Sequence, residues 1–147
     1  MSMRLNLAKI EAALLESVRA DPALIGTILV NDGQSHAGFS RETDMFAADY
    51  RILTAIAEGR AEAEHATTKW RRCYPWLATA TGENGENDIE GYEFGYGPAF
   101  VLDPVQVTAV AEGLAGERWG SGAGFEVLVA FYAAAAREGK AVVGGVN

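Results

Sequence analysis

A Glu-x-x-His pair is the first arrangement in this chain whose spacing could support chemistry. Glu62 and His65 form the pair, and Glu58 lies one helical turn earlier. Di-iron helix bundles need a second such pair and further glutamates from neighbouring helices. The chain has only two histidines, His36 and His65, so the second pair is missing. We therefore expect His65 to be a surface histidine beside acids, and we predict no metal ligands.

Alternating acids before a glycine resemble a calcium-binding loop. Glu86, Asp88 and Glu90 supply carboxylates at alternate positions ahead of Gly91. An EF-hand loop ends in a bidentate glutamate, but Gly97 stands at that position here. We predict no tight calcium site, and weak binding of a divalent cation is the remaining alternative. The same carboxylates are candidates for contact with a cationic partner.

Glycines and aromatic residues are interleaved along residues 91–97, with the sequence GYEFGYG. A phosphate-binding loop needs glycines between a strand and a helix N-terminus, usually with a lysine. These glycines precede a strand instead, and the nearest following cation is Arg118. We predict a bulged strand whose aromatic rings enter the core. The alternative is that Tyr92 and Tyr96 contact a flat ligand, because neighbouring glycines allow close approach.

Cations and aromatic rings are mixed in residues 69–76, with the sequence KWRRCYPW. Such mixtures occur in nucleic-acid-binding proteins, and Trp70 and Arg71 are the candidates for contacting an anionic ligand. The alternative is structural, because cations at a helix end complement its dipole and Trp70 lies on the apolar face. Cys73 could act as a nucleophile only with a histidine, and no Gly-x-Ser-x-Gly motif occurs. The sequence therefore predicts no catalytic residues and no cofactor.

The composition is that of one folded domain. The 147 residues are 49% apolar and 22% charged, as in ordinary globular proteins. No apolar run reaches the roughly 20 residues that cross a bilayer, so we predict no membrane span. Charged residues interrupt the N-terminal segment, and we predict no signal peptide. Cys73 is the only cysteine, so no internal disulfide can form, and we expect a cytoplasmic protein.

The hydrophobic periodicity predicts both helices and strands. Apolar residues alternate over residues 1–7 and again over 92–102, which is typical of strands. Helical spacing begins at Ala8, and the Asp-Pro pairs at 21–22 and 103–104 resemble helix starts. The remaining expected elements are a helix from Thr43 or Asp44 to Gly59, a helix over 61–73 ended by Pro75, a loop over 79–91, a helix over 125–138 and a last strand over 141–146.

The order of these elements favours an α+β fold. Consecutive helices without alternating strands argue against a doubly wound sheet. We therefore predict a mostly helical single domain, residues 1–147, with one small sheet. Its strands are the N-terminal strand, a central strand at about 92–102 and a C-terminal strand at about 141–146.

Negative charge is concentrated in one segment. The net charge is −8, and residues 73–117 contain eight acids and no lysine or arginine. The rest of the chain carries twelve cations and twelve acids, so the whole excess lies in this segment. Such a surface repels phosphate backbones, which argues against nucleic acid as its partner. It favours a basic protein partner, and a role in solubility alone is the alternative.

Two segments resemble the YfbM-like family of bacterial proteins. Residues 94–107, FGYGPAFVLDPVQV, are similar to that family's Gly-x-Gly-Pro junction, and residues 131–143, FYAAAAREGKAVV, to its closing helix and strand. The resemblance covers residues 92–146 and is looser elsewhere. It implies an α+β fold, a bacterial origin and no known activity. The family's central Asp-Leu-Asp-Lys-x-Trp segment is not matched, because residues 44–49 read DMFAAD.

These patterns predict a non-enzymatic interaction protein that presents an acidic face to a basic protein, with an inhibitor or immunity role as one version. The alternative is a small ligand-binding domain or enzyme with a pocket near the aromatic strand at 92–96. The candidate contact residues are Trp70, Arg71, Tyr92, Tyr96, Glu86, Asp88 and Glu90.

Overall fold

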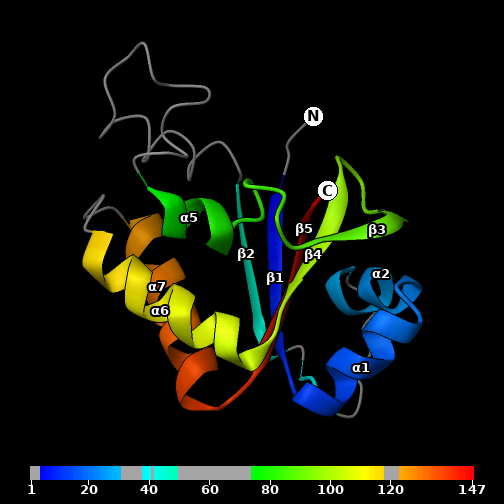
Figure 1. The fold of residues 1–147 in the computed structure, drawn as a ribbon, viewed down its shortest axis with the longest axis horizontal. Helices are drawn as coiled ribbons and strands as arrows, with labels where there is room; N and C mark the ends of the chain where they lie inside the picture. Colours follow the sequence, from blue (N-terminus) through cyan, green and yellow to red (C-terminus); the bar gives the residue numbers. More distant parts are fainter. Residues whose placement is uncertain (1–3, 31–37, 41, 50–73, 118–122) are drawn as a thin grey trace.

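The computed structural model describes residues 4–30, 38–40, 42–49, 74–117 and 123–147, and these ranges contain five strands and five helices (Figure 1). In chain order they are β1 (Arg4–Ile10), α1 (Ala12–Ala20), α2 (Ala23–Leu29), β2 (Met45–Asp49), α5 (Pro75–Ala80), β3 (Asp88–Glu93), β4 (Pro98–Leu102), α6 (Pro104–Glu117), α7 (Ala123–Arg137) and β5 (Ala141–Val146). None of the described helices is both long and apolar enough to cross a membrane.

The strands form one sheet with the order β2-β1-β5-β4-β3, and all neighbouring strands are antiparallel. The first and last strands lie side by side, with Leu7 opposite Gly144. β4 pairs with the other side of β5, with Val101 opposite Val143. The predicted α+β fold is confirmed, and its sheet joins the N-terminal, central and C-terminal parts of the chain.

Helices cover the two faces of the sheet in separate groups (Figure 1). α5, α6 and α7 lie on one side, while α1 and α2 lie on the other. Each side has its own hydrophobic cluster, because successive strand residues point to opposite faces. In β1, Leu5 and Leu7 join the α5–α7 cluster, whereas Ala8 and Ile10 join the α1–α2 cluster.

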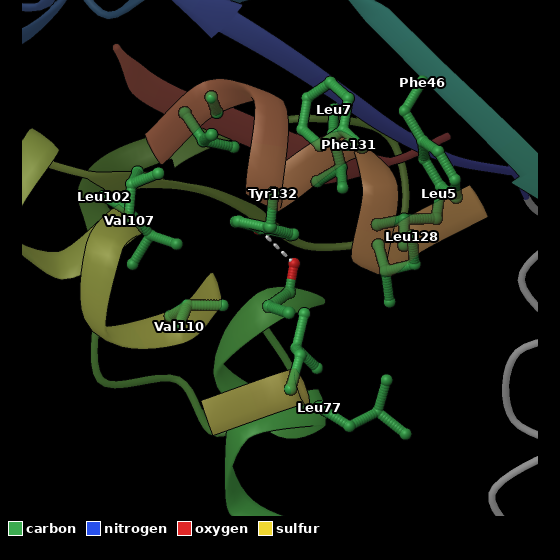
Figure 2. Close-up of a cluster of buried hydrophobic side chains, with 14 of the residues drawn as sticks. Leu5, Leu7, Phe46, Leu77, Leu102, Val107, Val110, Leu128, Phe131 and Tyr132 are labelled. Atoms are coloured by element: carbon green, nitrogen blue, oxygen red, sulfur yellow. Dashed lines mark hydrogen bonds between the residues drawn. The ribbon is translucent and has the colours of Figure 1, made fainter. Parts of the chain in front are cut away.

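The cluster on the α5–α7 side is built around Tyr132 of α7 (Figure 2). Tyr132 is fully buried, and its hydroxyl donates a hydrogen bond of 2.6 Å to the carbonyl oxygen of Ala80 in α5. Burial raises the pKa of this hydroxyl, which therefore keeps its proton. The ring of Phe131 lies 5.8 Å, centre to centre, from that of Phe46 in β2. α7 thus contacts both α5 and the edge strand β2 of the sheet.

α6 begins where the sequence predicts it, directly after Asp103. The side chain of Asp103 accepts a hydrogen bond of 2.8 Å from the backbone N–H of Gln106. In return, Gln106 Oε1 accepts one of 2.8 Å from the backbone N–H of Asp103. This capping box satisfies two backbone donors, and Pro104 fits the first helical position, where no donor is needed.

The predicted helix from Thr43 or Asp44 is wrong at its start, because Met45–Asp49 form strand β2. Asp44 looks like a helix cap in the sequence, but its Oδ2 accepts a hydrogen bond of 2.8 Å from the backbone N–H of Ser40 and closes a turn. β2 then pairs with β1, and this pairing overrides the local helical spacing. The remainder of that helix, and the helix predicted over 61–73, lie outside the described residues.

Two further boundaries differ from the predictions for the same reason. β1 continues to Ile10, and α1 begins at Ala12 rather than at Ala8. Residues 8–10 stay extended because they pair with Val143, Val142 and Ala141 of β5. Sheet pairing is a long-range interaction that the spacing of neighbouring residues does not reveal.

The predicted central strand is divided into a hairpin of β3 and β4. Gly91 and Gly95 have φ values of 78° and 68°, which glycine adopts at little cost. The chain therefore bulges within β3 and reverses direction after it. The loop predicted over 79–91 is also shorter, because α5 extends to Ala80 and β3 begins at Asp88.

Two glycines of β5 make room for aromatic rings of this hairpin. A Cβ atom on Gly144 would lie 2.6 Å from the ring of Phe100, and one on Gly145 would lie 2.5 Å from the ring of Phe94. Both phenylalanines are buried, on opposite faces of the sheet. The hairpin backbone that carries the acidic residues is therefore anchored to the central strand β5.

Candidate functional site

The hairpin brings most of the predicted contact residues to one end of the sheet. Asp88, Glu90 and Tyr92 lie on β3, while Glu86 precedes the strand and Tyr96 lies in the turn after it. β3 is the outermost strand on this side of the sheet. Trp70 and Arg71 lie outside the described residues, as do the two histidines and Cys73.

Asp88 and Tyr96 line a common pocket of about 120 Å³, which we call the acidic pocket. Its other lining residues include Thr81, Glu83 and Val146. The pocket opens between the turn after α5, the hairpin and the end of β5. It unites two of the predicted contact residues with an acid from the turn, although these residues are separated in the sequence.

The backbone around Tyr96 fixes one wall of the acidic pocket. The N–H of Tyr96 donates a hydrogen bond of 2.9 Å to the carbonyl oxygen of Val146, and the N–H of Phe94 donates one of 2.7 Å to Gly97. A Cβ atom on Gly95 would lie 2.8 Å from the backbone of Asn147, so only glycine fits this approach. The side chain of Tyr96 remains 45% exposed.

The acidic pocket is lined by carboxylates whose negative charges repel one another. Burial raises the pKa of Asp88 above its ordinary value of 3.8, and repulsion from Glu83 and Glu93 raises it further. Among the described residues, no cation is paired with the Asp88 carboxylate. The pocket can therefore accept an ammonium or guanidinium group, which would relieve the repulsion between the carboxylates. Within the described ranges, no three His, Cys, Asp or Glu side chains are grouped as metal ligands.

Tyr92 has a different role from Tyr96. It is partly buried and packs against the cluster on the α1–α2 side. A Cβ atom on Gly26 of α2 would lie 2.8 Å from the Tyr92 hydroxyl oxygen, so the helix approaches this side chain closely. Tyr92 therefore helps to support β3, as the prediction of core aromatic residues implies, and it does not line the acidic pocket. Glu90 is exposed on β3.

A second hollow surface lies beside Trp76 of α5. It consists of two adjoining hollows of about 360 and 260 Å³ that share Trp76, Thr79 and Glu86. We call it the tryptophan groove. Its lining also includes Asn84, Asn87 and Gln106.

Residues of α6 hold Trp76 in place. A Cβ atom on Gly113 would lie 2.1 Å from the indole ring, so the ring occupies the space that a larger residue would fill. The Glu117 carboxylate accepts hydrogen bonds from the backbone N–H groups of Trp76 and Leu77, at 2.8 and 3.0 Å. Burial raises the pKa of Glu117 despite these two bonds. Trp76 as a whole remains 37% exposed beside the groove.

Side-chain amides are fixed around the tryptophan groove. Gln106 Nε2 donates a hydrogen bond of 2.9 Å to Asn87 Oδ1. Asn84 Nδ2 donates one of 2.8 Å to Thr79 Oγ1, and Asn84 Oδ1 accepts one of 3.2 Å from the N–H of Glu86. The turn between α5 and β3 is thereby tied to both α5 and α6. The sequence interpretation placed Trp76 in the cation-rich cluster and missed this groove, because it took Pro75 as the end of a helix, whereas Pro75 is the first residue of α5.

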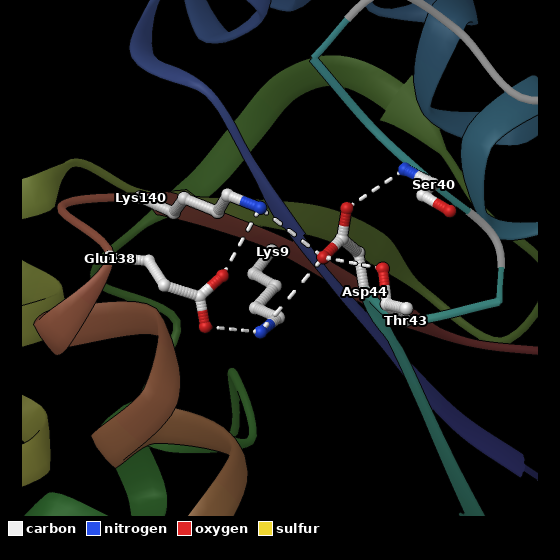
Figure 3. Close-up of polar contacts among 6 residues, drawn as sticks. All are labelled: Lys9, Ser40, Thr43, Asp44, Glu138 and Lys140. Carbon is white, nitrogen blue, oxygen red and sulfur yellow. Dashed lines mark hydrogen bonds and ion pairs between the residues drawn. The ribbon is translucent and has the colours of Figure 1, made fainter.

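The sequence interpretation missed a cluster of charged residues around Lys9 and Lys140 (Figure 3). It lies at the start of β5, whereas the acidic pocket lies at the end of that strand. Lys9 Nζ donates a hydrogen bond of 2.6 Å to Glu138 and lies 3.9 Å from Asp44. Lys140 Nζ lies 3.2 Å from Glu138 and 3.3 Å from Asp44. The available signal was Lys9 itself, a cation between the apolar residues Ala8 and Ile10, but its partners are distant in the sequence.

This cluster of two lysines and two acids is suited to structure rather than to catalysis. Burial alone would lower the pKa of Lys140, but hydrogen bonds to Glu138 and Asp44 outweigh it and raise the pKa. A catalytic lysine needs the opposite shift, because the neutral amine is the nucleophile or base. The four charges cancel, and they join β1, the turn before β2 and the turn between α7 and β5.

No protein-family model matches this chain, and no curated protein or solved structure matches it either. The similarity to YfbM-like proteins therefore stays a prediction.

Proposed function

We propose that this protein is a non-enzymatic interaction protein that binds a basic protein partner through its acidic edge. The acidic edge comprises Glu83, Glu86, Asp88, Glu90 and Glu93, on β3 and the turn before it. The observation that supports the proposal most directly is the gathering of these five carboxylates on the outermost strand and the turn before it, where two of them, Glu83 and Asp88, line a pocket that one cationic group can enter.

Electrostatics provide the physical basis of the proposed interaction. The carboxylates around Asp88 repel one another in the free protein. A lysine or arginine of a partner would replace this repulsion with attraction, and the same charges would steer the two proteins together. A nucleic acid would instead be repelled. We include a cytoplasmic location and a YfbM-like ancestry in this proposal, with inhibition of a basic toxin as one version of it.

Affinity capture with matched charge variants tests the proposal. The variant E83Q/D88N/E93Q removes charge from the acidic edge, and E16Q/E42Q/E126Q removes the same charge from other exposed positions. We expect a basic protein to be retained by the wild type and by the second variant, and to be lost from the first. The purified partner should bind at least about tenfold more weakly when salt rises from low to high concentration.

Two results would contradict this proposal. One is an interaction whose affinity is independent of ionic strength, because exposed charges are screened by salt. The other is an interaction mapped away from residues 83–117. Amide exchange or chemical-shift mapping with the purified partner distinguishes these cases.

The second candidate function is that of a small ligand-binding domain, and the presence of Tyr96 in the acidic pocket favours it. At about 120 Å³ the pocket is smaller than the roughly 300 Å³ at which drug-sized ligand sites begin, so its ligand would be a small amine. Calorimetry with methylguanidine and butylamine tests this function. Binding that is lost in Asp88→Asn supports it, and an absence of heat at millimolar ligand contradicts it.

A further inference from the structure

We infer that the tryptophan groove binds an arginine side chain of the basic partner, between the indole ring of Trp76 and the carboxylate of Glu86. This inference rests on the proposed function, because it concerns the same partner. It adds a second contact surface and a preference for arginine over lysine, neither of which the acidic edge alone would require.

The indole ring provides a surface for stacking. Trp76 is one of the few large hydrophobic side chains that the described residues leave substantially exposed. Contact with Gly113 and the two hydrogen bonds from its backbone and that of Leu77 to Glu117 hold it in place. A planar guanidinium stacks on such a ring and loses little hydration, whereas a compact, strongly hydrated ammonium gains less there.

The groove also provides hydrogen-bond acceptors. Glu86 lines both hollows of the groove, and no described cation is paired with its carboxylate. The bond from its backbone N–H to Asn84 fixes the turn that carries it. A carboxylate and a guanidinium form two parallel hydrogen bonds, which adds geometric selectivity for arginine. None of the described residues that line the groove is a lysine or arginine, so none of them repels a cation.

The groove is continuous with the acidic edge. Residues 83–88 separate the two hollow surfaces, with Glu83 and Asp88 lining the acidic pocket and Asn84, Glu86 and Asn87 lining the groove. A basic segment that crosses this turn could therefore place one cation on each side. Arginine and tryptophan also dominate the residues that contribute most to protein interfaces.

Two peptides distinguish the groove from the acidic edge. We would measure the affinity of the full chain for hexa-arginine and hexa-lysine by calorimetry at one salt concentration. We expect the wild type to bind hexa-arginine about three- to fivefold more tightly than hexa-lysine. A surface that recognises charge alone would bind the two peptides with equal affinity. The variants W76L and E86Q should each remove most of this preference, and W76F should retain part of it.

The controls keep the outcome interpretable. E86Q changes an exposed side chain and leaves the backbone contacts of the turn in place, so its fold is not at risk. E16Q removes one charge on the far side of the sheet and should preserve the arginine preference. Equal affinity of the wild type for both peptides, or an unchanged preference in E86Q, would overturn the inference.

The failure of the proposed function would look different. In that case E83Q/D88N/E93Q would bind both peptides as tightly as the wild type does. If that triple variant weakens both peptides equally while W76L and E86Q leave the arginine preference unchanged, the acidic edge binds cations and the arginine site does not exist.

Discussion

Lys9 and Asp88 carry opposite charges in contrasting surroundings. The ammonium of Lys9 is buried and lies beside the carboxylates of Glu138 and Asp44. The carboxylate of Asp88 is surrounded by other carboxylates, and burial together with their repulsion raises its pKa. The first residue serves the fold, because its charge is already neutralised. The second is available to a partner that supplies the missing positive charge.

The Lys9 cluster predicts a specific dependence of stability on pH. Hydrogen bonding from Lys9, assisted by Lys140, lowers the pKa of Glu138 below its ordinary value of 4.5. The unfolded chain therefore binds this proton more readily, so the stabilisation is complete above pH 4.5 and is lost as the pH falls through the lower pKa of the folded state. We expect Glu138→Gln to lose less stability than the wild type on acidification below this pH, as measured by urea denaturation.

Glu16→Gln is the control for this pH dependence, because Glu16 is exposed on α1 and forms no such cluster with the residues that the structure describes. It should lose stability on acidification in the same way as the wild type. Parallel stability curves for the wild type and Glu138→Gln would contradict the role assigned to the cluster.

A substitution at Tyr132 tests how much one buried hydrogen bond contributes to the stability of the core. Its hydroxyl donates the only buried side-chain hydrogen bond from α7 to α5 that the described residues show. Tyr132→Phe should lower the free energy of unfolding by about 1–2 kcal/mol, because the carbonyl of Ala80 loses a partner in a buried position. Tyr96→Phe changes an exposed hydroxyl and should have little effect. Equal stability of the two variants in urea denaturation would be inconsistent with this reading of the core.

Among the helices, α5 depends on α6 for its position. The Glu117 carboxylate takes the place of an N-cap, because it accepts hydrogen bonds from two N–H groups at the start of α5. Glu117→Ala should destabilise the protein by about 1–2 kcal/mol and should also release Trp76 from its fixed position. Glu112→Ala, at an exposed position of the same helix, is the matched control.

Thermal unfolding and Trp76 accessibility to a fluorescence quencher report on these two effects. The W76F substitution is made both in the wild type and in Glu117→Ala. The difference in fluorescence with and without W76F then gives the signal of Trp76 separately from that of the other tryptophans. Unchanged stability and unchanged quenching in Glu117→Ala would show that α5 does not need this contact.

The central strand predicts a second test at the level of elements. A methyl group on Gly144 would lie 2.5 Å from Leu7 and 2.6 Å from Phe100, so Gly144→Ala should cost about 1–3 kcal/mol through overpacking. Gly116 on α6 has open space at the same position, and Gly116→Ala should leave stability unchanged or raise it by about 0.5–1 kcal/mol. Denaturant unfolding of the two variants checks the contrast, and similar losses from both would refute the packing described for β5.

Elements with local signals were predictable from the sequence, and elements created by pairing were not. Asp103, Pro104 and Gln106 lie within four residues, so their capping box was readable, and α6 begins as expected. Asp44 carries a similar signal, but it closes a turn before β2. The reason is the pairing of β2 with β1, about forty residues earlier in the chain, which no local spacing records.

The candidate site was predictable in part. The run of acids made Glu86, Asp88 and Glu90 candidates, but the sequence interpretation placed them in a loop, whereas Asp88 and Glu90 lie on the outer strand β3. The sequence did not predict that Tyr92 packs against the core while Tyr96 lines the acidic pocket. This difference follows from a turn whose shape depends on Gly95 and on contact with β5. Trp76 and Glu117 were missed because they lie forty-one residues apart and meet only through helix packing.

For the molecule as a whole, the distribution of charge follows the architecture. The Lys9 cluster neutralises its own charges and joins β1, β2 and β5 at one end of the sheet. The acidic edge carries five carboxylates on the edge strand β3 and on the turn before it. The central claim is that these carboxylates are arranged to meet a cationic partner. A surface that served solubility alone would need no pocket between them.

The pKa of Asp88, followed by carboxyl-carbon NMR during a pH titration, tests that claim most directly. In the free protein we expect the pKa to lie above its ordinary value of 3.8, because of burial and of repulsion from Glu83 and Glu93. With the basic partner or saturating hexa-lysine bound, the pKa should fall, because a nearby cation favours the charged carboxylate. A pKa that is the same with and without the bound cation would contradict the account.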